Sequence, residues 1–394
     1  MIKRLALAAL IVCVAISLAM LVLKPVPGGR HYEYALLLSL ALTAIAFLYA
    51  ARPRTFFKKG TLAFVAICGL GLGAVNLSVL CSRSELVKCY GTVFDALESG
   101  KNPYTSGTIY HEIESSGTVS GNFNYPPLEI YPYYLAYRIA GTWNIAVLTV
   151  AMLLIQAFCG FVLFRMFPRI RPVFLLPFVP MILLGEVKTA VAMTLLLASL
   201  IFWAIKSDTE KPRAFHRYLI AVLFGLGLTT KFLIIPLMAA YYGHAFDPKD
   251  RRSLVRIGVD VLIALATAVL VMAPYGVMNV LKNTILFNLV LRDRAVLTTF
   301  YPNILSGPLA WLGLQALYPL AAVAILALSI LAAPKLRLFS AMLAAAYVFL
   351  IVAATPEPQF LPVLLFLVVV DQCMRIEGED LTAISRPLSI SNGE

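Results

Sequence analysis

The hydrophobic pattern of this chain consists of long apolar runs separated by short polar or basic segments. Most apolar runs have about 17–25 residues, the length at which an α-helix crosses the hydrocarbon core of a bilayer. The pattern therefore predicts about twelve transmembrane helices, some of them short. They cover residues 5–23, 35–51, 62–81, 144–165, 172–185, 187–206, 217–230, 232–243, 254–273, 316–333, 338–354 and 358–374.

Composition supports this interpretation. Of the 394 residues, 61% are hydrophobic and only 13% are charged, more apolar surface than a soluble globule can bury. The predicted fold class is all-α, a polytopic transmembrane helical bundle. The run at 5–23 follows Lys3 and Arg4, as a signal peptide would. It is long for a signal and lacks a cleavage site of small residues, so we expect it to be the first transmembrane helix.

The net charge of +12 reflects basic connecting segments, which face the cytoplasm according to the positive-inside rule. These segments alternate correctly with the predicted helices if the N- and C-termini are both cytoplasmic. We therefore expect a multi-pass protein of the plasma membrane and no nucleic-acid partner. The basic clusters are Arg52 to Lys59, Arg165 to Arg171, Lys206 to Arg217, Lys249 to Arg252, and Lys335 with Arg337.

The same alternation requires the helix-like stretch Pro126–Ile139 to lie at the outer surface instead of crossing the membrane. Its tyrosines, and Trp143 after it, are side chains that favour the headgroup interface. Two large polar segments, Ser82–Trp143 and Tyr275–Asn303, are then expected to face the outside.

Candidate catalytic carboxylates lie in the first polar segment, in "SRSELVKCYGTVFDA" (82–96). A carboxylate at the top of a transmembrane helix, here Glu85 or Asp95, could act as general base toward a sugar hydroxyl. Ordinary solvated charges of an outer loop are the alternative. Cys81 and Cys89 flank a short polar stretch that we expect outside the cell, where either a disulfide or two free thiols can exist.

Two turn sequences follow, "GKNPY" (Gly100–Tyr104) and "FNYPPL" (Phe123–Leu128). Gly permits unusual dihedral angles, and X-Pro steps keep the chain extended. The result is a stiff aromatic wall that could bind the face of a sugar. A rigid connector between interfacial helices is the other interpretation. The candidate substrate-binding residues here are Asn102, Tyr104, Asn124 and Tyr125, with Tyr90 before them.

A lone lysine, Lys231, lies between two short apolar segments in "GLGLTTKFLIIP" (Gly225–Pro236). A lysine in mid-membrane costs about 2.5–3.5 kcal/mol unless an anion compensates it. A phosphate is a natural partner for such a point charge. A lysine that extends its ammonium to the outer interface is the alternative.

More polar residues are expected on the outer side. Glu186 and Lys188 lie where one predicted helix turns into the next, as substrate contacts or as a local ion pair. In the second polar segment, Arg292 and Arg294 could contact a donor phosphate or lipid headgroups. Asn303 completes the candidate substrate-binding set.

No nucleotide-binding loop, metal-ligand pattern or nucleophile elbow is visible in the sequence. Asp260 and Asp371 lie near the inner ends of predicted helices, and we interpret them as structural.

In this order, the motifs resemble the GT-C class of membrane glycosyltransferases, and within it the polyprenol-phosphate-mannose-dependent mannosyltransferases. That family has a carboxylate after an early span, then a tyrosine, a G-x-PY turn and an aromatic-YPP segment. The matching positions here are Glu85, Tyr90, Gly100–Tyr104 and Phe123–Pro127.

Later elements of the family pattern match as well, at Gly185-Glu186 and Leu226–Pro236, so that the resemblance covers about residues 62–374. It implies that 61–376 is a GT-C-like catalytic membrane domain that includes the outer loop 82–143. Residues 1–60 are then two accessory transmembrane helices, and 377–394 form a cytoplasmic tail.

The resemblance implies an inverting transfer of a hexose, with mannose as first choice, from a polyprenyl-phosphate sugar. The acceptor would be a glycan or lipid on the outer face, next to membrane lipid, and neither metal nor cofactor is expected. The family base is usually Asp, whereas Glu85 stands near that position and Asp95 lies closer to the turn, so both stay candidates. Lys231, with Arg292 or Arg294, would hold the donor phosphate.

A secondary transporter or flippase for a lipid or sugar is the alternative function. It accounts for the spans and for a buried lysine, but it gives no reason for the order of the two turns.

Overall fold

The computed structural model describes residues 80–106, 109–113, 117–167, 189–230, 234–247, 249–284, 303–332 and 336–352, with positions 15, 367, 370, 371, 373 and 374. The predicted spans at 5–23, 35–51, 62–81, 172–185 and 358–374 lie wholly or mostly outside these residues. The accessory helices in 1–60 and the tail at 377–394 lie outside them too.

The described residues are predominantly helical, as the apolar runs predict. The longer helices are α4 (Leu80–Glu98), α5 (Ile130–Ala140), α6 (Ile145–Met166), α9 (Thr189–Glu210), α10 (Ala214–Leu228), α11 (Ile234–Ala245), α12 (Arg251–Met272), α16 (Tyr318–Ala332) and α17 (Leu338–Val352). The short ones are η2 (Pro127–Glu129), η3 (Ala273–Tyr275), α13 (Val277–Leu281), α15 (Ser306–Trp311) and η5 (Gln315–Leu317).

Within these described segments, three helices are long and apolar enough to cross a membrane, at Ile145–Met166, Ala192–Glu210 and Arg251–Tyr275. Shorter apolar helices occupy Ala214–Leu228 and Leu338–Phe349. All five coincide with predicted spans. The total of about twelve spans stays a prediction.

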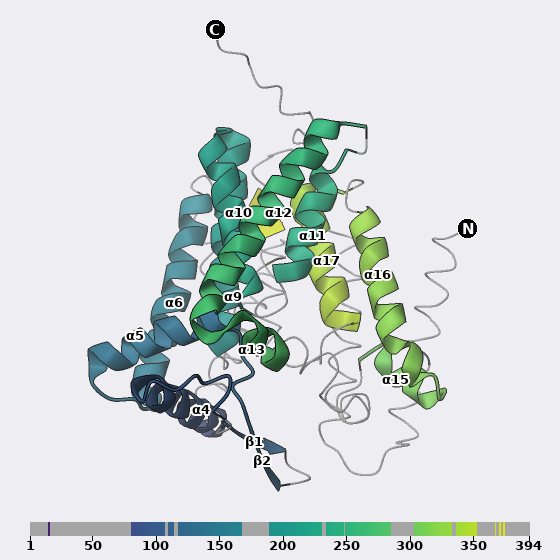
Figure 1. Ribbon diagram of the computed structural model, residues 1–394. Coiled ribbons are helices and arrows are strands. Elements are labelled where there is room, and N and C mark those ends of the chain that lie inside the picture. Colours follow the sequence, from purple (N-terminus) through teal and green to yellow (C-terminus); the bar gives the residue numbers. More distant parts are fainter. Residues whose placement is uncertain are drawn as a thin grey trace, which may run out of the picture.

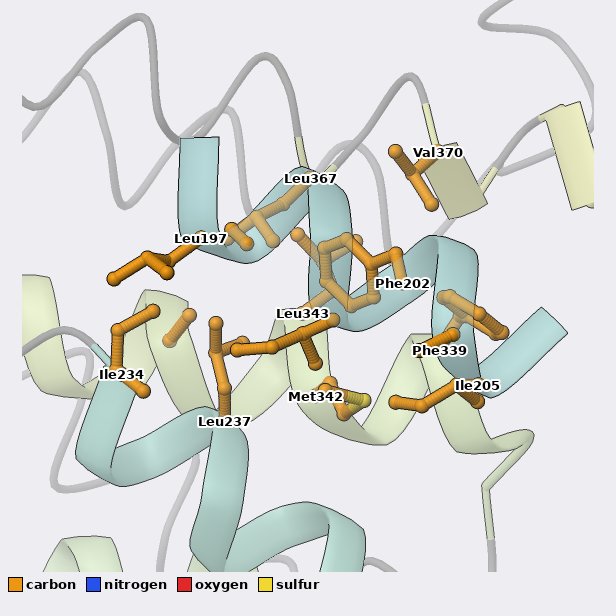
Figure 2. Packing of buried hydrophobic residues seen from close by; sticks show 14 of the residues in the cluster. Leu197, Phe202, Ile205, Ile234, Leu237, Phe339, Met342, Leu343, Leu367 and Val370 are labelled. Carbon is orange, nitrogen blue, oxygen red and sulfur yellow. The ribbon is translucent and has the colours of Figure 1, made fainter. Parts of the chain in front are cut away.

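The helices pack into a bundle in which α6, α9, α10 and α12 are successive neighbours, and α11 packs against α17. Figure 2 shows the apolar core where α9, α11 and α17 meet, with Phe202, Leu237 and Leu343 buried together. Truncation of a buried leucine such as Leu237 to alanine costs roughly 2–5 kcal/mol. The bundle is therefore held by apolar packing, as in other helical proteins.

Close approach of α10 to α12 depends on Gly225. A Cβ at this position would collide with the carbonyl oxygen of Ala264 and with the Cβ of Thr267. A Cβ on Gly227 would collide with the side chain of Ile234. Part of the "GLGL" sequence is thus explained by helix packing.

An ion pair joins the same two helices nearer their other end. Arg217 Nε lies 2.9 Å from both carboxylate oxygens of Asp260, and Arg217 Nη2 lies 2.8 Å from Oδ1. The structure therefore supports the interpretation of Asp260 as structural. Asp371 accepts a hydrogen bond of 2.7 Å from the hydroxyl of Ser340, which supports the same role.

The helix α5 does not continue into α6, because the chain turns sharply between them. Gly141 adopts a left-handed conformation with φ of 67°, which ends α5. The side chain of Asn144 then accepts hydrogen bonds from the backbone N–H groups of Ala146 and Val147, which caps α6. As a result, α4 and α5 run across one end of the bundle (Figure 1).

One element is not predicted by the sequence pattern, an antiparallel hairpin of β1 (Ile109–Ile113) and β2 (Gly117–Gly121). It lies in the polar segment, where the chain has no apolar run to bury as a helix. β-branched residues such as Ile109 and Val119 favour a strand there. The all-helical prediction is confirmed for the apolar segments, and the hairpin is an addition to it.

The disulfide considered for Cys81 and Cys89 does not form, because Cys89 carries a free thiol. The geometric reason is that both residues belong to the continuous helix α4. Eight helical residues rise about 12 Å, whereas a disulfide needs Cα atoms within about 7 Å.

Candidate active site

The candidate site lies at the end of the bundle that α4 and α5 cross, where η2, α13 and the hairpin also lie (Figure 1). The described residues of the first polar segment, Ser82–Trp143, lie at this end. It also receives the chain as it leaves α12 through η3.

A cluster of buried aromatic rings forms the centre of this end. Tyr90 of α4 makes edge contacts with Phe123 and Tyr133, with ring centroids 5.8 and 5.2 Å apart. Tyr104 makes similar contacts with Phe123 and Tyr275, each at 5.5 Å. Such tilted and edge-on pairs stabilise a fixed arrangement beyond the area that they bury. The rings thus pack into one cluster, and the stiffness that the turn sequences predict stays a prediction.

The "GKNPY" turn is clamped to the segment that follows α12. Gly100 has φ of 69°, a conformation that favours glycine. The amide of Asn102 donates to the carbonyl of Tyr275 at 2.6 Å and accepts from the backbone N–H of Tyr104 at 2.9 Å. Asn283 donates to the carbonyl of Tyr104 at 2.9 Å. These contacts support the connector interpretation for Asn102, and its contact with a substrate stays a prediction.

The "FNYPPL" turn packs directly against the first turn. The backbone N–H of Phe123 donates to the carbonyl of Pro103 at 3.0 Å. The hydroxyl of Tyr104 donates to the carbonyl of Tyr125 at 2.6 Å. The structure thus brings together Tyr104, Asn124 and Tyr125. Tyr104 is fully buried, while Asn124 and Tyr125 are half-buried.

A buried carboxylate that the sequence interpretation missed, Glu129, lies directly after this turn, in η2. Its side chain is completely buried, and Oε2 accepts a hydrogen bond of 3.3 Å from the hydroxyl of Tyr90. Burial of a carboxylate is costly unless polar or charged groups surround it. One signal was available in the sequence, since Glu129 is the only acidic residue between Glu114 and Glu186.

Burial and the charge of Glu129 together raise the pKa values of two neighbouring side chains. Burial raises the pKa of the Cys89 thiol to about 12, and the negative charge of Glu129 adds to this. The pKa of Tyr104 is also raised, first by burial and then by Glu129. Both groups therefore stay protonated at physiological pH.

The same turn contacts the end of α10. The backbone N–H of Leu128 donates to the carbonyl of Thr229 at 3.2 Å. The hydroxyls of Thr229 and Thr230 donate back to the carbonyls of Leu226 and Gly227 and close the end of the helix. This is the point in the sequence that immediately precedes Lys231, which lies outside the described residues.

The two candidate general bases both belong to α4. Asp95 is exposed, on a different face of the helix from the buried Tyr90 and Phe94. The structure therefore does not bring Asp95 into the aromatic cluster. Glu85 lies in the first part of α4, and its side chain is outside the described part of the chain.

Asn303 is buried at the start of α15, where it acts as a cap. Its Oδ1 accepts from the backbone N–H groups of Leu305 and Ser306 at 2.9 and 2.7 Å. Its Nδ2 donates to the hydroxyl of Tyr318 at 3.1 Å. These bonds favour a structural role over the expected substrate contact. The other candidates, Glu186, Lys188, Arg292 and Arg294, lie outside the described residues.

The described geometry provides a wall of packed aromatic rings and amides, with the buried carboxylate of Glu129 beside it, and α4 carries the candidate bases Glu85 and Asp95 in its sequence. Such a set can orient a sugar and accept a proton from a hydroxyl. No protein-family model, no curated protein and no solved structure matches the chain.

Proposed function

We propose that the chain is an inverting glycosyltransferase of the membrane, using a polyprenyl-phosphate sugar as donor. The transferred hexose is mannose in the first instance, and the acceptor is a lipid or glycan on the outer face. The observation that carries the proposal is the contact of three distant segments at one end of the bundle. The turns Gly100–Tyr104 and Phe123–Leu128 hydrogen-bond to each other, and Leu128 hydrogen-bonds to Thr229, two residues before Lys231.

In the proposed reaction, a carboxylate of α4 removes the proton of the acceptor hydroxyl. The hydroxyl oxygen attacks the anomeric carbon from the face opposite the phosphate. The bond from that carbon to the phosphate oxygen breaks, and the polyprenyl phosphate leaves with the electron pair. Glu85 and Asp95 are both candidates for the base. Asp95 is open to solvent, so it would have to be covered when the acceptor binds.

The leaving phosphate carries negative charge that the apolar surroundings cannot stabilise. Lys231, with Arg292 or Arg294, would neutralise it. Because phosphate is a fair leaving group once neutralised, no second carboxylic acid is required, in contrast to glycoside hydrolysis. Asn124 and Tyr125, half-buried in the second turn, would contact sugar hydroxyls.

The proposed orientation places this end of the bundle outside the cell. The ends of α6, α9, α10 and α12 away from α5 carry or adjoin exposed basic residues (Figure 1). Cytoplasmic segments are enriched in such residues. They are Arg165, Lys211, Arg213, Arg251 and Arg252.

The test is a transfer assay with purified protein in lipid nanodiscs. Radiolabelled polyprenyl-phosphate mannose, glucose or arabinose is supplied with a pool of lipid and glycan acceptors. Lys231→Met should abolish transfer. The matched control Lys211→Met, an exposed lysine at the opposite end, should leave transfer unchanged.

Two carboxamide variants then identify the base. Loss of transfer in Glu85→Gln alone assigns Glu85, and loss in Asp95→Asn alone assigns Asp95. Glu98→Gln, an exposed carboxylate on the same helix, serves as control. If folded wild-type protein neither transfers nor hydrolyses any of these donors, the proposal is wrong. Flux of a lipid or sugar across the membrane would then favour the transporter.

A further inference from the structure

We propose that Glu129 is a positioning residue: through Tyr90 its carboxylate fixes α4, which carries both candidate bases, against the η2 turn and the end of α10. The inference rests on the proposed function where turnover is measured, and on the structure alone where helix order is measured.

Glu129 lies between two elements of the fold and, with Leu128 before it, contacts both. Its carboxylate accepts from Tyr90, which is 39 positions earlier in the chain and completely buried in α4. The residue before it, Leu128, donates to the carbonyl of Thr229 at the end of α10. Glu129 therefore lies at the link between the helix of the candidate bases and the helix that leads to Lys231.

Tyr90 belongs to the same helix as both candidate bases. Glu85 and Asp95 each lie five residues from Tyr90 along one continuous helix, one on either side. A helix moves as a unit over such a length, so the position of Tyr90 determines the position of both. The indole N–H of Trp143 also donates to the carbonyl of Val87 at 2.9 Å and holds the same part of α4.

The side chains of Glu129 and Tyr90 are both completely buried. In the described structure, neither the Glu129 side chain nor the Tyr90 side chain has a surface that a sugar could touch. A role in contact with the acceptor would need at least one exposed oxygen. Action through α4 needs none, which favours positioning over direct catalysis.

A pair of opposite substitutions tests the assignment. Glu129→Gln removes the charge but keeps an oxygen that can accept from Tyr90, at the same side-chain length. Glu129→Asp keeps the charge but withdraws the oxygens by one methylene. Positioning by the hydrogen bond predicts that Glu129→Gln keeps kcat within about threefold, whereas Glu129→Asp lowers it by about 10- to 100-fold, because small misplacements of a reacting group have effects of this size.

Tyr90→Phe should reproduce the loss seen in Glu129→Asp, with little change in KM for the donor, because α4 affects the transition state more than binding. The double variant should be no slower than Glu129→Asp alone, because both changes break one interaction. The proposal is overturned if Glu129→Gln is inactive while Tyr90→Phe is normal, since Glu129 would then be the base itself. It is also overturned if none of the three variants changes kcat.

An activity-independent measurement keeps the two proposals separate. Amide hydrogen exchange of α4 should become faster in Tyr90→Phe and Glu129→Asp and stay unchanged in Glu129→Gln, with α12 as internal control in every variant. Should wild-type protein show no turnover, the glycosyltransferase proposal fails, and exchange in α4 still decides the role of Glu129. Unchanged exchange in Tyr90→Phe and Glu129→Asp would overturn the positioning role.

Discussion

The two ends of the bundle each bury a carboxylate, but they hold it differently. At one end, Asp260 of α12 receives the guanidinium of Arg217 through contacts of 2.8–2.9 Å. At the other end, Glu129 of η2 accepts from a neutral phenol, Tyr90, at 3.3 Å. Parallel hydrogen bonds between a guanidinium and a carboxylate, as in the Arg217–Asp260 pair, are stronger than one longer bond from a neutral phenol.

This difference separates a contact that stabilises the bundle from a contact that positions one helix. The Arg217–Asp260 pair fastens α10 to α12 and is complete within the described structure. The link from Glu129 to Tyr90 is a single, longer bond, and it positions α4 at the proposed active end. The comparison predicts that changes at the first end mainly reduce stability, and changes at the second mainly alter turnover.

The largest effect is expected from Arg217→Met. Removal of the guanidinium leaves Asp260 buried without its charge partner, which costs roughly 3–5 kcal/mol of unfolding free energy. Unfolding in mild detergent measures this loss. The double variant Arg217→Met with Asp260→Leu should recover most of it, because an apolar pair has no unpaired charge. A single variant as stable as the wild type would remove the contrast between the two ends.

The next effect concerns α10, which runs between the two ends. Gly225→Ala places a methyl group against the backbone of Ala264, so the helices must separate. Overpacking of this kind costs about 1–3 kcal/mol. Gly258→Ala is the matched control, because a Cβ there meets no atom within 4 Å. In a helix that change should stabilise by about 0.5–1 kcal/mol. Equal melting temperatures for the two variants would contradict the close helix contact.

A smaller loss of stability is expected at the active end. Tyr104→Phe removes the hydroxyl that donates to Tyr125 at 2.6 Å. A hydrogen bond of this type contributes about 1 kcal/mol. We expect a small change in the midpoint of unfolding and a larger relative fall in kcat, since the two turns are then joined only by the backbone bond from Phe123 to Pro103 among their described hydrogen bonds. A loss of stability as large as that of Arg217→Met would contradict the assignment of the two roles.

The smallest effect is a change in the reactivity of one thiol. Cys89 has a pKa of about 12, from burial and from the charge of Glu129. Glu129→Gln removes the second cause, so the pKa should fall and maleimide labelling at about pH 9 should become faster. Cys159, buried in α6, is the control thiol. An unchanged rate for Cys89 would mean that Glu129 is uncharged in the wild type.

The same thiol affects stability in alkali. Its folded pKa of about 12 lies above that of an unfolded thiol, so the unfolded chain loses this proton first. Its contribution to stability is therefore complete below about pH 8.5 and is lost as the pH rises toward 12.

The sequence pattern predicted the helices well because burial of apolar runs depends on length and hydropathy alone. The bounds of α6 and α12 lie within a few residues of the predicted 144–165 and 254–273. The hairpin at 109–121 was missed because its segment is short and polar, and pairing of strands depends on contacts that hydropathy does not encode.

The candidate site was predicted in part. The Pro and Tyr content of Gly100–Tyr104 and Phe123–Leu128 predicted an aromatic wall, and the structure adds that the two turns contact each other. Glu129 was not predicted because it lies just beyond the "FNYPPL" turn, in a stretch that the pattern assigns only to the outer surface. Asn303 caps a helix, and its contact with a substrate stays a prediction. A polar residue in a sequence carries no mark of the partner it finds in three dimensions.

The most direct test of the central claim is a single-turnover experiment with radiolabelled polyprenyl-phosphate mannose in nanodiscs. We expect transfer of the sugar to an acceptor with inversion of the anomeric configuration. Lys231→Met should abolish this transfer, and Lys211→Met should not. Retention of configuration, or equal transfer in the two lysine variants, would contradict it.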